Sequence, residues 1–213
     1  MKSIDFIRRD FYFQIGNPHT ECYPLPNFNL CKNITRIDEE LHQHDLDCIS
    51  DLPKLKFLRI YGEIEDSSYL GHFHQINFSS LKYLILSICT NFESIFNELS
   101  KAHFPSLKRL IVINSKEDTS KSLANSLEGF IRNVPSLTSI HLKSRIFHGV
   151  VSGINHQFIF KMLKDANVII IDSIKEWTEG RELENFLLMK DSAIYGKYKY
   201  LKNEYRKWEN TFG

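Results

Sequence analysis

The sequence predicts an α/β solenoid, in which short parallel strands and helices alternate along the chain. The main observation is one template, apolar-x-x-Leu-x-x-apolar-x-apolar, that occurs four times. The copies are LPKLKFLRI from Leu52, FSSLKYLIL from Phe78, FPSLKRLIV from Phe104 and VPSLTSIHL from Val134. Their first residues lie 26, 26 and 30 positions apart, and a weaker copy, LKDANVIII, begins 29 further on at Leu163. Self-similarity of this period is typical of one supersecondary unit that is stacked repeatedly.

The closing apolar-x-apolar pair of the template predicts a short strand, because residues two apart point to the same side of a strand. The Leu that stands three positions before the pair leads the chain into that strand and joins the same core. We therefore expect a common set of leucines to be buried in adjacent parallel strands. They are Leu55, Leu58, Leu84, Leu86, Leu107, Leu110, Leu137 and Leu142.

Helices are predicted between the strands. Phe92, Ile95, Phe96 and Leu99 are spaced i, i+3, i+4 and i+7, which places them on one face of a helix. A second stripe has the same character and consists of Leu123, Leu127, Phe130 and Ile131. A strand followed by a helix every 26 to 30 residues favours a curved α/β solenoid. A doubly wound sheet is the alternative, but the βα units of such a sheet do not share a common sequence motif.

The stretch LKYLILSICTNF, from Leu81 to Phe92, resembles the leucine-rich repeat proteins, and most closely the cysteine-containing repeats of F-box proteins. The resemblance implies parallel strands on a concave side and helices on a convex side. It also implies that Cys89, three residues after Leu86, caps the turn by bonding to neighbouring backbone. The sequence departs from this pattern in the other repeats, where the equivalent positions are Glu63, Ser115, Arg145 and Ile174. No F-box is visible at the start of the chain.

The repeats divide the chain into three parts. Residues 1–27 are expected to form an irregular N-terminal repeat or cap, which includes a possible strand in DFYFQI. Residues 28–175 hold the leucine-rich repeats, and residues 176–213 form a helical C-terminal cap. Within the cap, an apolar stripe with 4, 3, 4, 3 spacing resembles a heptad pattern and consists of Ile194, Tyr198, Leu201, Tyr205 and Trp208. We expect Tyr205 and Trp208 to pack against the body of the protein, because a solenoid needs its last apolar layer covered.

The composition of the 213 residues is that of an ordinary globular protein, with 42% hydrophobic residues and a net charge of +1. This near-neutral charge argues against a dominant nucleic-acid surface. The first residues, MKSIDFIRRDF, carry charges where a signal peptide has an apolar core, and no run reaches transmembrane length. The four cysteines show no disulfide framework, which favours the cytoplasm or the nucleus.

The sequence gives only weak signals for metal binding and for catalysis. Two histidine pairs, His42 with His44 beside Asp45 and His72 with His74, have the spacing at which one strand face could hold a metal ion. Both pairs lie in expected loops without a recurrent Cys or Glu ligand, so we expect neither a metal nor another cofactor. Nucleophile elbows, glycine-rich phosphate loops and H-E-x-x-H are missing from the sequence. We therefore expect a protein that is not an enzyme.

The residues that flank each closing pair are expected to face the concave side. From strand to strand they are Phe57, Arg59 and Tyr61; Tyr83, Ile85 and Ser87; Arg109, Ile111 and Ile113; Ser139, His141 and Lys143; then Val168, Ile170 and Asp172. A contiguous apolar patch usually marks an interaction site, and Tyr and Arg often dominate binding energy. The expected site is an exposed patch made of Phe57, Arg59, Tyr61, Tyr83, Ile85, Arg109, Ile111 and His141. The alternative is that the N-terminal arm or the C-terminal helix folds over this sheet.

These observations together favour a non-enzymatic protein-interaction module. The resemblance to F-box proteins implies substrate recognition for a ubiquitin ligase, with a protein partner docked on the concave sheet. The alternative is a subunit of a nucleic-acid-associated assembly that uses the basic C-terminal helix. Nucleic acid is the less favoured partner, no membrane is expected, and the chain could be one subunit of a larger complex.

Overall fold

The computed structural model describes residues 35–40, 52–61, 67–76, 78–88, 90–114, 122–144 and 154–212. In these residues the protein is α/β, with one six-stranded parallel sheet whose strands lie side by side in sequence order. The strands are β1 (Arg36–Glu40), β2 (Phe57–Tyr61), β3 (Tyr83–Ile88), β4 (Arg109–Asn114), β5 (Ser139–Ser144) and β6 (Ile169–Asp172). The expected N-terminal part, residues 1–27, lies outside the described residues, as does Cys89.

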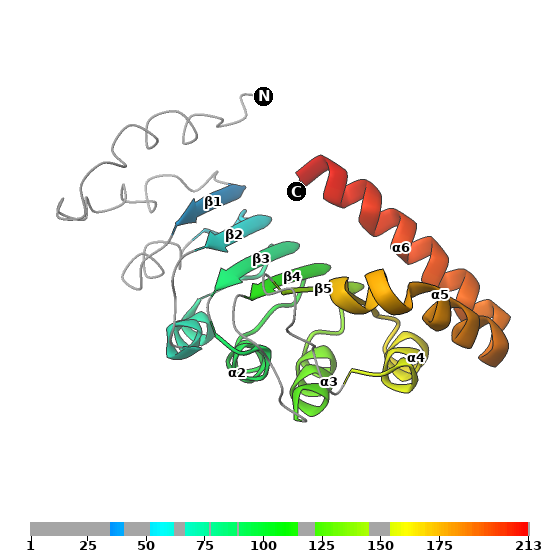
Figure 1. The fold of residues 1–213 in the computed structure, drawn as a ribbon. Coiled ribbons are helices and arrows are strands. Elements are labelled where there is room, and N and C mark those ends of the chain that lie inside the picture. The colour runs from blue at the N-terminus through cyan, green and yellow to red at the C-terminus, as the bar shows by residue number, and fades with distance from the viewer. Residues whose placement is uncertain are drawn as a thin grey trace, which may run out of the picture.

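The helices form two groups relative to the sheet. A 3₁₀ segment, η4 (Ser67–Gln75), is followed by α2 (Phe92–Leu99), α3 (Leu123–Asn133) and α4 (His156–Asp165), and both helical stripes expected from the sequence are confirmed in α2 and α3. Figure 1 shows α2, α3 and α4 along one side of the sheet. Helix α5 (Ser173–Lys190) and helix α6 (Ser192–Phe212) complete the chain, and α6 runs back over the other side of the sheet.

The template has a recurring hydrogen-bond pattern in the structure. At its start, the N–H of the Leu bonds to the carbonyl of the apolar residue three positions earlier, as Leu81 does to Phe78 at 3.1 Å. The same bond joins Leu55 to Leu52 and Leu137 to Val134, both at 3.0 Å. The strand that follows each turn pairs with the strand of the preceding repeat. These shared turns account for the recurring sequence motif P/S-S-L, since a small or proline residue suits the tight turn before a strand.

The apolar core lies between the sheet and helices α2 to α4. Strand register stacks Leu58, Leu84, Leu110 and Ile140 into one column, and all four are fully buried. The eight leucines that the template marks as core are all buried, as expected, but Leu55, Leu107 and Leu137 lie just before their strands and not within them. Equivalent phenylalanines also meet between repeats, because the Phe78 and Phe104 rings stack with their centroids 5.2 Å apart. The repeated sequence thus produces a repeated core.

The register expected for the last strand is wrong by one residue. The sequence template placed Val168, Ile170 and Asp172 on the side away from the core, whereas Ile170 pairs with the core residue Ile140. Helix α4 continues to Asp165, and Asn167 then adopts a left-handed backbone conformation with φ of 59°. Asn tolerates this conformation better than most residues, and the turn takes up one residue more than the template allows.

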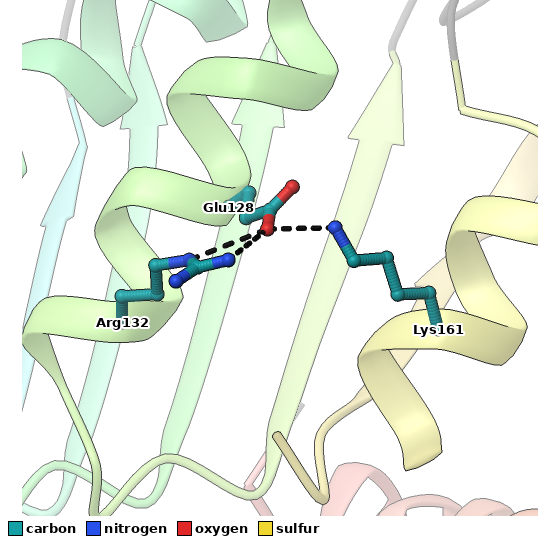
Figure 2. Close-up of polar contacts among 3 residues, drawn as sticks. All are labelled: Glu128, Arg132 and Lys161. Carbon is teal, nitrogen blue, oxygen red and sulfur yellow. Dashed lines mark hydrogen bonds and ion pairs between the residues drawn. The ribbon is translucent and has the colours of Figure 1, made fainter. Parts of the chain in front are cut away.

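The outer side of α3 and α4 carries a small ionic network, drawn in Figure 2. One carboxylate oxygen of Glu128 accepts hydrogen bonds from Arg132 at 2.6 Å, on the same helix, and from Lys161 at 2.9 Å, on α4. The pKa of Glu128 is lowered by the hydrogen bond from Arg132 and then by that from Lys161. The network joins neighbouring helices on the side of the sheet that α6 does not cover.

Helices α5 and α6 are joined at Asp191, whose carboxylate accepts hydrogen bonds from the backbone N–H of Ala193 at 2.8 Å and Ile194 at 3.1 Å. This contact satisfies donors that a helix start leaves open. Among the described helices, none combines the length and the apolar composition that a membrane span needs. Deep burial of Tyr198 and Leu187 fixes the two helices against the last repeat.

Candidate functional site

The strand register assembles the expected site residues into two columns on the side of the sheet away from α2 to α4, here called the open face. Phe57, Tyr83 and Arg109 are successive partners in one column. The second column runs through Arg59, Ile85, Ile111 and His141. Both columns are those expected from the sequence. Tyr61 pairs with Ser87, but its side chain lies outside the described residues.

The expectation that these residues form an exposed patch is wrong. Phe57, Ile85, Ile111 and His141 are only 5, 3, 4 and 4% exposed, and Arg59, Tyr83 and Arg109 are half-buried. Over strands β3 to β5 the cover is the protein's own helix α6 (Figure 1), which was the alternative. The physical reason is that α6 offers aromatic side chains to a face that carries aromatic and aliphatic ones.

Trp208 is the main aromatic contact between α6 and strands β3 and β4. Its ring stacks on Tyr83, with centroids 5.6 Å apart and planes 20° apart. The guanidinium of Arg109 lies 5.4 Å from the centre of the same indole, a cation–π distance. Arg109 Nη1 also donates a hydrogen bond of 3.4 Å to the backbone carbonyl of Glu204. The two half-buried residues at the centre of the expected site thus hold one side chain of α6.

The contact between α6 and β5 is polar and lies about one helical turn from Trp208. The Tyr205 hydroxyl hydrogen-bonds to His141 Nδ1, and the two rings meet edge to face with centroids 5.0 Å apart. Next to them, Lys143 forms an ion pair with Glu209. Burial first, and the charge of Lys143 second, lower the pKa of His141 to about 3. His141 is therefore neutral at physiological pH and acts as a hydrogen-bonding partner, without charge, inside this contact.

The N-terminal half of α6 is held by α4 and α5. Lys197 Nζ donates to the carbonyl of Leu163 at 3.2 Å, and Lys202 Nζ lies 3.3 Å from the Glu184 carboxylate. On the exposed side of the helix, Lys207 pairs with Glu204 at 3.0 Å. These contacts pair basic side chains of α6 with acceptors within the chain, whereas a nucleic-acid surface on α6 would need the same side chains to bind phosphates. The prediction that Tyr205 and Trp208 pack against the body of the protein is confirmed.

One histidine of the pair in η4 has a hydrogen bond within that segment. His74 Nδ1 hydrogen-bonds to the carbonyl of Gly71 in the same segment. In the part of the chain that the structure describes, no three His, Cys, Asp or Glu residues lie close enough together to hold a metal ion. The other pair, His42 and His44, and its neighbour Asp45 lie outside that part.

Four contact residues were not assigned to the site from the sequence: Lys143, Tyr205, Trp208 and Glu209. The heptad-like stripe of α6 identified two of them as packing residues, but nothing in the stripe indicated which surface they meet. No model of a known protein family matches the chain, and no curated protein matches it. The function is therefore argued from the geometry of the open face and α6.

Proposed function

We propose that this chain is a non-enzymatic protein-interaction module. In this proposal it is a leucine-rich repeat solenoid, similar to the substrate-recognition part of F-box proteins, and it works in the cytoplasm or nucleus. A protein partner docks on the open face, where over β3 to β5 it takes the place of α6, and no covalent bond is made or broken there. As in that family, the bound partner would be presented for ubiquitination, with the adaptor motif supplied by another part of the assembly.

The repeat assignment rests on three features that recur together. The template appears at near-constant spacing, three of its four copies enter their strands through the same hydrogen-bonded turn, and successive strands pair in sequence order. A stacked architecture of this kind creates a broad sheet face from residues that are dispersed in sequence. That face is suited to multipoint contact with another protein.

One observation carries the binding role: the open face accepts a helix through an aromatic and cationic cluster. Tyr83 and Arg109 hold an indole, and His141 holds a phenol. Tyr, Trp and Arg are the residues that most often dominate protein interfaces, because they combine large apolar area with directional polar contacts. A face that holds such side chains from α6 is chemically able to hold them from a partner.

The test is capture of a partner from lysate by the immobilised protein, followed by calorimetry with the purified partner. We expect the double variant Tyr83→Ala/Arg109→Ala to weaken binding by roughly tenfold or more, because hot-spot residues of this kind carry that much binding energy. The matched control is Arg132→Ala/Lys161→Ala on the helical side, which should leave affinity unchanged. The reverse pattern, with affinity lost only in the control, would contradict docking on the open face.

Salt dependence separates the nucleic-acid alternative from a protein partner. A surface that neutralises phosphates loses affinity steeply as salt rises, because counterions are released on binding. Affinity for the captured partner should fall much less between about 50 and 200 mM salt than it does for such a surface. A steep log–log loss, together with retention on an oligonucleotide, would favour the alternative.

A further inference from the structure

Helices α5 and α6 are separated by a single residue, Asp191, at which α6 turns back from the end of α5 (Figure 1). The hydrogen bonds of both helices nevertheless include this residue. Its N–H donates to the carbonyl of Leu187 and its carbonyl accepts from the N–H of Tyr195, both at 2.9 Å and both across four residues, as in an uninterrupted α-helix. The bend is confined to the N–H groups between them, and Asp191 Oδ1 accepts hydrogen bonds from two of these, those of Ala193 and Ile194.

Straightening this junction exchanges these hydrogen bonds without a net loss. In one continuous helix, the N–H groups of Ala193 and Ile194 donate to the carbonyls of Met189 and Lys190, four residues back. Two bonds to a carboxylate are thus replaced by two bonds to backbone. The bent form is stabilised chiefly by the contacts that α6 makes further along, with the open face, α4 and α5.

The apolar stripes of the two helices are in phase across the junction. Leu183 and Leu187 are buried in the last turns of α5, and the stripe of α6 begins at Ile194, seven residues later. With Asp191 between them, the combined series has spacings of 4, 4, 3, 4, 3, 4 and 3, which places every member on one face of a continuous helix. The series is Leu183, Leu187, Asp191, Ile194, Tyr198, Leu201, Tyr205 and Trp208. Asp191 is its one charged member.

We propose that α6 exchanges between two copies of this chain to form a dimer, and that Asp191 holds the bent, monomeric form. In the dimer, α5 and α6 of each copy are one continuous helix, and α6 lies on the open face of the other copy. Trp208 meets Tyr83 there and Tyr205 meets His141, as they do within the monomer. Exchange of an identical element is a low-cost route to a closed dimer, because both forms make the same contacts. This inference goes beyond the proposed function, since it needs no other protein.

Two effects of Asp191 favour the bent form. Its carboxylate caps α6 only where the chain bends, because the capped N–H groups have backbone partners in a continuous helix. In the dimer, α5 of one copy and α6 of the other together rebuild each pair of helices, so both junctions lie where the two long helices cross. Two Asp191 carboxylates then approach each other on an apolar seam, where repulsion between like charges is strong.

The tether also favours the monomer. A short connection gives α6 an effective concentration of about millimolar at its own open face. The wild type is therefore a monomer at about 10 μM and forms the exchanged dimer as the concentration approaches about 1 mM. Loss of the Asp191 cap moves this balance toward the dimer.

The first experiment measures the mass of the full chain by light scattering over this concentration range. Asp191→Ala removes the cap and introduces the best helix former at a half-buried position. We expect a dimer dissociation constant roughly 25-fold lower than that of the wild type, since a lost cap shifts each junction by about fivefold and a dimer contains two junctions. The matched control is Asp191→Asn, which keeps a capping oxygen and should stay within about fivefold of the wild type.

A mixing experiment shows whether α6 crosses between copies. In the Asp191→Ala background, one copy carries Tyr205→Ala/Trp208→Ala on α6 and the other carries Tyr83→Ala/Arg109→Ala on the open face. Every α6 contact is damaged in a dimer of either copy alone, whereas the mixed dimer contains one native contact. Because these side chains touch one another, their losses are not additive, and mixed dimers should exceed the statistical ratio by roughly tenfold in native mass spectrometry.

A milder pair of copies repeats this test where the alanine variants lose the folded circular dichroism spectrum. One copy carries Lys143→Glu and the other Glu209→Lys, so each alone sets like charges against each other and the mixed dimer restores opposite charges at both faces. Enrichment of mixed dimers supports exchange. A statistical ratio in a pair that stays folded, or a folded Asp191→Ala that remains a monomer up to about 1 mM, would overturn it. Partner capture is done at micromolar concentration, where the chain is a monomer, so the proposed function and the exchange fail independently.

Discussion

His141 is a titratable side chain buried in the contact between β5 and α6. Three polar groups face it: the Tyr205 hydroxyl, the Lys143 ammonium and the Glu209 carboxylate, whose oxygen lies 3.8 Å from Nδ1. The carboxylate alone would favour a protonated imidazole. That carboxylate is paired with Lys143, and burial first and the charge of Lys143 second lower the pKa of His141 to about 3.

This lowered pKa predicts a pH dependence of stability. The unfolded chain binds a proton at His141 below its ordinary pKa of 6.5, whereas the folded protein does not until about pH 3. The contribution of His141 is therefore fully present above pH 6.5 and is lost as pH falls toward 3, by at most about 1.4 kcal/mol per pH unit. Denaturant unfolding at a series of pH values should show a shallower loss for His141→Gln than for the wild type.

The control for this experiment is His103→Gln, because His103 is an exposed histidine at the end of the α2 repeat. We expect its pH profile to follow that of the wild type. Parallel profiles for His141→Gln and the wild type would show that the imidazole is not held neutral by the contact with α6.

A substitution at Leu84 tests the packing of the apolar core, again at the scale of a single residue. Leu84 is fully buried in the central leucine column, between Leu58 and Leu110. Leu84→Ala should lower the free energy of unfolding by about 2–5 kcal/mol, because the cavity adds to the lost burial. Lys82→Ala, two residues away and exposed, should change it by less than about 0.5 kcal/mol. Chemical denaturation measures both, and similar values for the two variants would contradict the repeated core.

At the scale of elements, the Glu128 network between α3 and α4 should contribute little. Surface ion pairs contribute between about 0 and 1 kcal/mol, because water screens them and long side chains lose freedom. Arg132 is mostly exposed. Glu128→Gln should therefore lower the unfolding free energy by less than about 1 kcal/mol at neutral pH.

The pKa shift of Glu128 fixes the pH range in which this small effect appears. Because the folded-state pKa lies below the ordinary value of 4.5, the stabilisation is present above pH 4.5 and is lost as pH falls below it. The wild type and Glu128→Gln should therefore converge in acid when their thermal unfolding is compared. A gap that widens in acid would contradict the direction of the shift.

Helix α6 is the element whose removal should matter most for the surface. Deletion from Asp191 onward takes away Trp208 and Tyr205 and uncovers Tyr83, Arg109 and His141. Exposed apolar patches promote association, so the truncated protein should be less soluble and melt at a lower temperature. Light scattering and calorimetry measure these effects. A monomer with an unchanged melting temperature would mean that α6 does not cover the face in solution.

At the scale of the whole molecule, much of the architecture could be predicted from the sequence. Strand and helix periods differ, so the closing pairs of the template and the stripe from Phe92 to Leu99 identify β3, β4, β5 and α2 without ambiguity. The same alternation assigns core and open-face residues, because each strand begins at an equivalent place in its repeat. The two columns through Tyr83 and Ile85 follow directly.

Two features could not be predicted, and both depend on tertiary contacts. The register of β6 is set by the left-handed turn at Asn167, which adds a residue that the template does not contain. The cover over the open face depends on contacts such as Lys143 with Glu209, which lie far apart in the sequence. The stripe of α6 shows which side of the helix is apolar, and it cannot show which surface that side meets.

The most direct test of whether a partner can reach the open face beneath α6 is native-state hydrogen exchange of the full chain. We expect amides in the second half of α6 to exchange through an opening that leaves β3 to β5 protected, since weakly held elements open at lower free energy than the core. A single opening free energy shared by α6 and the strands would show that α6 is a permanent part of the fold and would contradict docking on the face beneath it.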